Sequence, residues 1–208
     1  RQAGQGQEAQ VSPGPGATMT AMTRMPPREA TYDDVLALPE HVIGEIVDGE
    51  LVVSPRPAPL HALAASAIAE ELGPPFKRGR GGPGGWVILF EPELHLGKDV
   101  LVPDVAGWRR ERMPEVPIDQ PYFTLAADWV CEVLSPSTAR LDRTRKLAAY
   151  ARNRVGHVWF VDGLNQTLEV LRLDGDTYRI VLTAAAAERV RAEPFDAIEL
   201  DLAILWQR

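Results

Sequence analysis

Two nearly continuous apolar runs, separated by one basic helical segment, constrain the fold more than any other feature. The runs read ADWVCEVL and HVWFVD. Runs of this kind are typical of strands buried on both faces of a sheet. The segment between them has helical periodicity from Ser137 or Thr138, one of which we expect to cap it, to about Arg154, with Gly156 closing it. This order predicts an α/β or α+β protein in which a helix crosses over a central mixed sheet.

Turn signals divide the rest of the chain into short elements. The run DVLVPDVAGW reads as a strand in which Pro103 indicates an edge, a bulge or a strand boundary. Apolar residues between 195 and 205 predict one more strand and a final turn. We also expect a short helix from Thr31 to Pro39, a hairpin around Asp48-Gly49, a helix over 60–72 ended by Gly73, one bent strand or two strands over 85–96, and a hairpin around Asp174-Gly175.

Composition bounds the class of protein. A chain of 208 residues, 45% of them hydrophobic, is long enough for one sizeable core. No apolar run approaches the roughly 18 residues of a membrane helix, and the single cysteine, Cys131, excludes a disulfide framework. A net charge of -7 argues against a protein that coats nucleic acid, although one local basic patch remains compatible with an enzyme that acts on it. We therefore expect a soluble, cytoplasmic, single-domain protein.

The N-terminal segment differs in composition from everything after it. Residues 1–27 are rich in Gln, Gly, Pro, Ala and Thr and have almost no large apolar side chains. Such a segment cannot bury enough apolar surface to offset its ordering entropy. It contains Met19, Met22 and Met25, which suggests an over-long predicted start. We expect a disordered tail over 1–27 and a working domain over 28–208.

Three polar residues stand where the surrounding pattern predicts a core. Asp104 interrupts an apolar run, Glu132 lies inside the most apolar strand, and Lys146 lies on the following helix, four residues after Asp142. A buried carboxylate is costly unless it is paired or bound to a metal. If Asp104 and Glu132 meet, they form a hard-oxygen site of the kind that Mg²⁺ accepts, with Lys146 beside the attacking water.

A structural interpretation of the same residues stays open. Glu132 would then pair with Lys146 or an arginine, and Asp104 would cap a turn. The helix itself is locally basic, because six cations between 138 and 154 face one acid, Asp142. A basic helix beside an acidic pocket suits a metal-dependent phosphodiesterase, although basic helix faces are also common as plain solvated surfaces. The six cations are Arg140, Arg143, Arg145, Lys146, Arg152 and Arg154.

These motifs, in this order, resemble a known family. A VPD strand is followed by EVLSPST, by D-x-x-x-K-L-x-x-Y on a helix and by a VWFVD strand. The segment GEIVDGELVVSPRPAPLHALAASAIAEEL resembles the N-terminal half of the same family. On these residues the chain is similar to the Uma-two family of restriction endonuclease-like proteins, from about Thr31 to Val170.

The resemblance implies a PD-(D/E)XK nuclease-like fold and a Mg²⁺- or Mn²⁺-dependent DNA endonuclease. It implies that Asp104 and Glu132 bind the metal, with the Val133 carbonyl as a third contact and Glu45 as a further carboxylate. Leu134 stands where the usual signature has its lysine, and Lys146 takes that role from the helix. We expect the basic helix, with Arg143 and Arg145, and the KRGR loop, with Lys77, Arg78 and Arg80, to contact phosphates. His61 is a further candidate for contact with nucleic acid.

Two rival functions and one assembly follow from the same reasoning. The chain could be a catalytically silent nuclease-fold protein that binds nucleic acid or a protein partner, because fold alone does not prove activity. It could also carry the polar cluster for stability only. Nuclease-like folds commonly act as homodimers, since cutting two strands needs two sites. Trp108, Trp206 and the apolar C-terminal segment are the expected interface.

Overall fold

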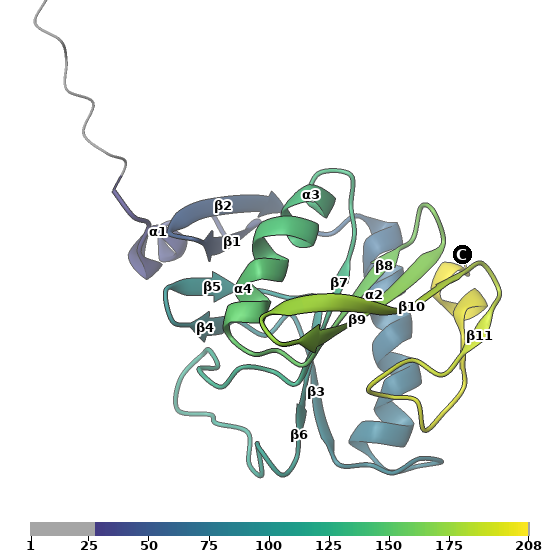
Figure 1. The fold of residues 1–208 in the computed structure, drawn as a ribbon. Coiled ribbons are helices and arrows are strands. Elements are labelled where there is room, and N and C mark those ends of the chain that lie inside the picture. The colour runs from purple at the N-terminus through teal and green to yellow at the C-terminus, as the bar shows by residue number, and fades with distance from the viewer. Residues whose placement is uncertain (1–27, 208) are drawn as a thin grey trace, which may run out of the picture.

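The fold is built around a six-stranded mixed sheet (Figure 1). The strand order is β10-β9-β8-β7-β6-β3, and β7 and β8 form the parallel pair that the two apolar runs predict. The bounds are β3 Trp86–Phe90, β6 Val105–Arg109, β7 Trp129–Val133, β8 His157–Asp162, β9 Thr167–Asp174 and β10 Thr177–Ala185. This computed structural model describes residues 28–207, so the expected tail over 1–27 lies outside the described residues.

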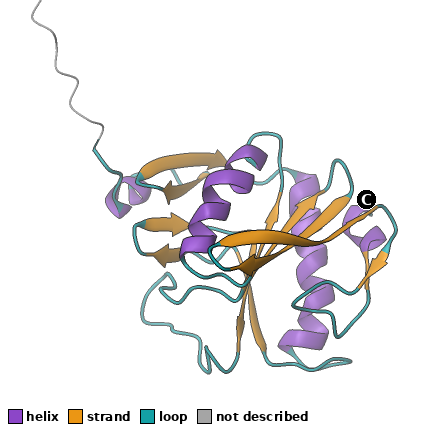
Figure 2. Ribbon diagram, viewed as in Figure 1, coloured by secondary structure: helices purple, strands orange, loops and turns teal. Residues whose placement is uncertain are grey.

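Helical segments cover both faces of this sheet (Figure 2). On one face, α2 (Pro59–Leu72) packs with the C-terminal 3₁₀ helix Leu202–Trp206 against the tryptophans of β7 and β8. On the other face, α4 (Leu147–Arg152) buries Tyr150 against residues of the same two strands. Because both faces are covered, β7 is buried along its whole length. The α/β prediction with a mixed sheet flanked by helices is confirmed.

A second, four-stranded antiparallel sheet lies beside the first. Its order is β2-β1-β5-β4. The predicted first hairpin is present, because β1 and β2 are joined by Asp48 and Gly49, which both have a positive φ, as a two-residue turn between twisted strands requires. The short helix α1 (Tyr32–Leu36) precedes this sheet, and Thr31 and Asp34 form its capping box. The bounds are β1 Val42–Val47, β2 Glu50–Pro55, β4 Leu94–Leu96 and β5 Asp99–Leu101.

The run around Pro103 is two strands rather than one. β5 ends at Leu101 in the small sheet, and β6 begins at Val105 in the large sheet. Of the three alternatives that Pro103 left open, the strand boundary is correct. The break leaves Asp104 at the junction of the two sheets.

The crossover helix differs from the prediction at both ends and in its middle. Thr138 precedes the helix, but its side chain makes no capping hydrogen bond. α3 (Ala139–Leu141) leads into a π-helical turn, Asp142–Lys146, before α4. The helix ends at Arg152, and Arg154 rather than Gly156 adopts the left-handed conformation that stops it, with φ 61°.

Smaller corrections concern the turns. The second hairpin turns at Gly175-Asp176, because Asp174 still pairs with Thr177. Lys77 belongs to a π-helical turn, Gly73–Lys77, that continues α2. The C-terminal region forms a two-stranded ribbon of β11 (Arg189–Val190) and β12 (Leu200–Asp201).

The expected interface residues are buried. Trp108 is 0% exposed and its indole N–H donates to the carbonyl oxygen of Leu125, while Trp206 is 8% exposed and packs in the core beside α2. The prediction of an interface at Trp108 and Trp206 is therefore wrong, because both faces of the sheet are covered within one chain. In the part of the chain that the structure describes, no helix is long and apolar enough to cross a bilayer.

Candidate active site

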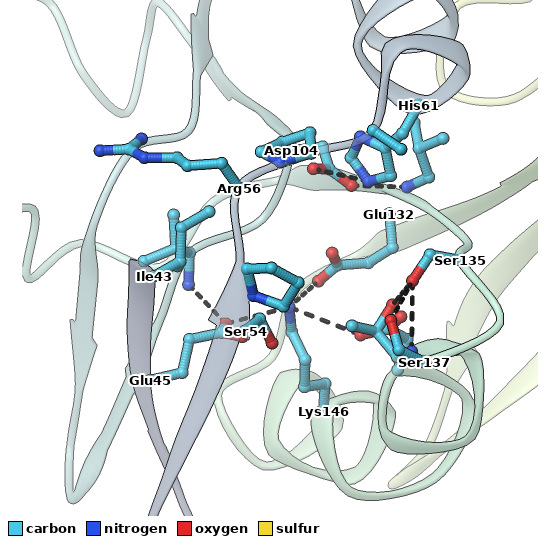
Figure 3. Close-up of a pocket in the computed structure, with 17 residues that line it drawn as sticks. Ile43, Glu45, Ser54, Arg56, His61, Asp104, Glu132, Ser135, Ser137 and Lys146 are labelled. Atoms are coloured by element: carbon cyan, nitrogen blue, oxygen red, sulfur yellow. Dashed lines mark hydrogen bonds and ion pairs between the residues drawn. The ribbon is translucent and has the colours of Figure 1, made fainter. Parts of the chain in front are cut away.

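A small pocket opens where the two sheets and the crossover helix meet (Figure 3). Its volume is about 150 Å³. β1 contributes Glu45, the β5–β6 junction contributes Asp104, and the central strand β7 contributes Glu132. The other lining residues include Ser54, Arg56, His61, Val133, Ser135, Ser137, Thr138, Asp142 and Lys146. Segments that are far apart in sequence thus bring Asp104, Glu132 and Lys146 into one cavity.

Asp104 is held by one backbone and one side-chain contact. Its Oδ2 accepts a hydrogen bond from the Val133 N–H at 2.6 Å, which fixes the β5–β6 junction against β7. The Nε2 of His61, from the first turn of α2, lies 3.2 Å from its Oδ1. Both side chains are about one-seventh exposed, so the carboxylate remains open to the pocket.

Glu132 is almost fully buried in β7. Its Oε1 accepts a hydrogen bond from the Tyr150 hydroxyl at 2.5 Å and lies 2.8 Å from the Nζ of Lys146. Burial raises the pKa of Glu132 well above its usual value, the Lys146 ammonium opposes this, and the acids at Asp142, Asp104 and Glu45 add to it. The charged form of the Glu132 carboxyl group is therefore stabilised by any cation that lies close to it.

Lys146 lies at the centre of three carboxylates. Its Nζ is 2.8 Å from Glu132, 3.0 Å from Glu45 and 3.7 Å from Asp142, and its side chain is 3% exposed. Burial alone would lower the pKa of Lys146, but the carboxylates of Glu132 and Glu45 raise it well above its ordinary value. Lys146 is consequently an ammonium at neutral pH.

The π-helical turn is part of this arrangement. π-helical turns inside α-helices are frequent at functional sites. The turn spans Asp142–Lys146 and contains both the acid and the base that the i, i+4 spacing predicted to be neighbours. Burial raises the pKa of Asp142, and the Lys146 ammonium counteracts it.

The pocket carries more negative than positive groups. Glu45, Asp104, Glu132 and Asp142 line it together with the Lys146 ammonium, the His61 imidazole and, at the rim, the Arg56 guanidinium. Burial lowers the pKa of His61, but the hydrogen bond and charge of Asp104 outweigh burial and leave it raised. The His61 Nδ1 is buried without a hydrogen-bond partner among residues 28–207. The charge balance favours a further cation in the pocket.

The donor set fits an open site for a hard cation. Among the described residues, no three His, Cys, Asp or Glu side chains converge as a closed metal cage. Mg²⁺ commonly uses only one or two carboxylates and completes its octahedron with water and substrate phosphates. Asp104 and Glu132 both line the pocket and meet that need. Glu45 lines it too, and its Oε1 contacts Lys146 and accepts from the Val102 N–H at 2.8 Å, much as the Oε1 of Glu132 contacts Lys146 and Tyr150.

Arg56 was not singled out from the sequence, and Ser137 and Thr138 were expected only as helix caps. The Arg56 side chain is 58% exposed at the rim and lies 3.8 Å from the exposed Glu91. Ser135 Oγ lies 3.0 Å from the hydroxyls of both Ser137 and Thr138. Nothing in the local sequence distinguishes Arg56 from other surface arginines, because its contacts with the Glu40 carbonyl and with Glu91 join separate segments of the chain.

Most arginines of the crossover helix form ion pairs with acidic side chains. Arg143 pairs with Glu169, and Arg145 lies 2.7 Å from Glu50 and also bonds the Val47 carbonyl. The acids that pair with these arginines come from distant strands and were not anticipated from the sequence, and contact of Arg143 and Arg145 with phosphate stays a prediction. Arg152 pairs with Asp48 and Asp99, and Arg154 pairs with Asp176. Among residues 28–207, only Arg140 of these cations forms no ion pair.

The KRGR loop is remote from the pocket. His61 lies in the first turn of α2, whereas Lys77, Arg78 and Arg80 follow its last turn (Figure 1). A 14-residue helix is about 21 Å long at 1.5 Å per residue. The structure therefore separates these three cations from Asp104 and Glu132.

Comparison with known proteins identifies the family. The family model described as "Uma2: Putative restriction endonuclease" matches residues 32–204. The chain belongs to the Uma2 family. The resemblance read from the VPD, EVLSPST and VWFVD segments is thereby confirmed.

A solved structure has the same fold. It is described as a "putative nuclease belonging to DUF820" from Anabaena variabilis ATCC 29413. It is 22% identical in sequence, and the TM-score is 0.69 over 85% of this Uma2 chain and 97% of the other. At this identity the likeness concerns the fold. Among curated proteins, none matches the chain.

Proposed function

We propose that this Uma2 protein is a divalent-metal-dependent endonuclease that hydrolyses phosphodiester bonds of DNA in the cytoplasm. The observation that carries the proposal is the meeting of Asp104, Glu132 and Lys146, from three distant segments, in one pocket of a chain whose family is described as restriction endonucleases. An excess of carboxylates in that pocket supports a requirement for a cation.

Asp104 and Glu132 would hold Mg²⁺ or Mn²⁺, with the Val133 carbonyl as a further contact. Bound there, the metal would supply positive charge to the phosphate oxygens and activate water. Glu45 serves chiefly to hold Lys146, since its Oε1 is 3.0 Å from Nζ. The Val133 N–H fixes Asp104 from the neighbouring strand.

Lys146 acts as a hydrogen-bond donor and fixed positive charge. The carboxylates of Glu132 and Glu45 raise the pKa of Lys146 and so favour its ammonium form, which suits a hydrogen-bond donor. From beside Glu132 it orients the attacking water and offsets the charge that develops on the phosphate. Arg56, exposed at the rim, offers a guanidinium to the same substrate.

Metal binding and plasmid cleavage test the proposal together. Wild-type protein should bind Mn²⁺ in calorimetry and cut supercoiled plasmid with Mg²⁺ or Mn²⁺, and EDTA should stop the cutting. Asp104→Asn and Glu132→Gln should each lose metal binding and at least about 100-fold in rate, because each removes charge stabilisation of the transition state. Asp176→Asn makes the same chemical change at a fully exposed position and should behave as wild type.

Other outcomes favour the rival functions. Duplex binding without cleavage at any metal concentration would favour a silent nuclease-fold protein that binds nucleic acid. Unchanged metal binding in both variants, with an altered free energy of unfolding, would favour a purely structural ion-pair network. We further propose that the enzyme works as a homodimer, because cleavage of two strands requires two sites.

A further inference from the structure

Five exposed cations gather at the end of the molecule opposite the pocket. They come from two segments that the fold ties together: the Arg110 N–H donates to the Gly85 carbonyl at 2.8 Å, and Arg109 pairs with Trp86 across β3 and β6. We call this set the distal basic surface, and its members are Lys77, Arg78, Arg80, Arg109 and Arg110.

The cations of the distal basic surface are not neutralised. Among residues 28–207 none of the five forms an ion pair, in contrast to the arginines of the crossover helix. Two neighbouring acids are already engaged, Asp128 with Arg112 at 2.7 Å and Glu193 with Arg172 at 3.0 Å, which leaves Glu111 beside the surface. Removing the five cations from the net charge of -7 would leave -12, so positive charge is concentrated here against the rest of the chain.

The surface is shaped as well as charged. On the side of Arg109 and Arg110, a hollow of about 380 Å³ is lined by these two arginines together with Trp86 and Glu111. The Arg109 guanidinium lies 4.8 Å from the Trp86 ring centroid, which fixes its orientation. A planar guanidinium that is already positioned loses little entropy when it binds a phosphate oxygen pair.

β6 connects this surface to the pocket. The strand starts at Val105, beside Asp104, and ends at Arg109 (Figure 1). Five residues of strand span about 16 Å at 3.3 Å per residue. Phosphates on one DNA strand advance about 3.4 Å per base pair along the duplex axis, so this span corresponds to about five base pairs.

We propose that the distal basic surface binds the sugar–phosphate backbone of the DNA substrate about five to six base pairs from the scissile bond. The inference rests on the proposed nuclease function, because it takes the substrate to be DNA. The surface supplies affinity that the acidic pocket cannot, since carboxylates there repel phosphate until a metal is bound. Contacts of this kind are independent of sequence and position the duplex.

Duplex binding without cleavage isolates the surface. A fluorescein-labelled 20-base-pair duplex is titrated in EDTA by fluorescence anisotropy, at NaCl concentrations from 50 to 200 mM. The variant is Arg78→Gln/Arg80→Gln, which changes two exposed loop side chains. The control is Arg179→Gln/Arg189→Gln, which removes the same charge from exposed positions of β10 and β11.

Loss of two phosphate contacts should make the negative slope of log K against log[salt] shallower by about 1.8. It should lower the affinity at 100 mM by about tenfold or more. The control should keep the wild-type slope. Equal slopes and affinities in all three proteins, or a wild type that binds no duplex at 50 mM, would overturn the inference. Mn²⁺ binding by the wild type, and its loss in Asp104→Asn, test the pocket independently of duplex binding. Failure of this inference can therefore be distinguished from failure of the nuclease proposal.

Discussion

At the residue scale, the candidate site depends on hydrogen bonds that hold buried carboxyl groups. Glu132 illustrates this, because its Oε1 is shared by the Tyr150 hydroxyl and the Lys146 ammonium. Sequence reasoning found Glu132 by its place within an apolar run. It did not predict the hydrogen bond from the Tyr150 hydroxyl, because an aromatic residue on the buried face of a helix is expected to be a core residue.

Tyr150→Phe should lower the free energy of unfolding by about 1–3 kcal/mol, since it leaves a buried acceptor without its hydroxyl donor. The matched control is Tyr178→Phe, whose hydroxyl donates to the Val155 carbonyl at 2.6 Å in a half-buried place that water can reach. We expect that change to cost about 0.5–1.5 kcal/mol. Urea denaturation of the three proteins measures the difference, and an equal loss in both variants would contradict the special role of the Glu132 contact.

The roles of the site residues could be only partly anticipated. A polar residue that breaks a local apolar or helical pattern can be recognised from the sequence alone, and this applies to Asp104, Glu132 and Lys146. The partners of the helix arginines are not visible in this way, because Asp48 and Glu50 lie about a hundred positions from Arg145 and Arg152. Whether an arginine is free or paired is therefore a property of the fold.

At the element scale, ion pairs join the crossover helix to the four-stranded sheet. The Asp99 side chain is 2% exposed, and its two oxygens accept from the Asp48 N–H at 2.9 Å and from Arg152 at 2.9 Å. The helix end and the first hairpin are thereby fixed to the strand that leads into Asp104.

Arg152→Ala should destabilise the protein by about 1–3 kcal/mol, because a buried carboxylate loses its charged partner while the arginine itself was half exposed. Backbone amides of β1 and β5 should exchange hydrogen faster than those of β7. Arg179→Ala removes an exposed pair with Asp174 and should change the stability by less than about 0.5 kcal/mol. Uniformly faster exchange in both sheets would argue against a local contact.

Helices and strands were predicted correctly where the periodic pattern of apolar residues extends over several residues. They were not predicted where a proline or a very short strand interrupts that pattern. The β7–helix–β8 unit and both hairpins follow from runs of at least five residues with clear turns. The second sheet does not, because β4 and β5 have three residues each and Pro103 is compatible with several strand arrangements. The π-helical turn likewise has no sequence signal, since it preserves the pattern of a helix.

At the scale of the whole molecule, charge is arranged in two regions. The pocket concentrates carboxylates around Lys146, and the distal basic surface concentrates free cations at the far ends of β3 and β6. A chain with a net charge of -7 can therefore still carry a locally basic surface. Net charge alone misses such a surface, because it averages over both regions.

A homodimer should have twice the 22.8 kDa mass of one chain in light scattering at micromolar concentration. The interface should leave Trp108 and Trp206 untouched, because both are already buried within one chain. A quenching experiment on tryptophan fluorescence should accordingly be insensitive to concentration. A scattering mass of one chain at the same concentration would contradict the dimer.

The junction at Asp104 has a consequence for synthesis on the ribosome. Glu45 belongs to the small sheet, Glu132 to the large one, and Lys146 to the helix that follows, so the groups that compose the pocket emerge one after another. Until residue 146 has left the exit tunnel, the nascent chain has all four acids of the pocket without their ammonium, and their mutual repulsion opposes closure of the two sheets. The pocket of a chain of this design is therefore completed only late in translation.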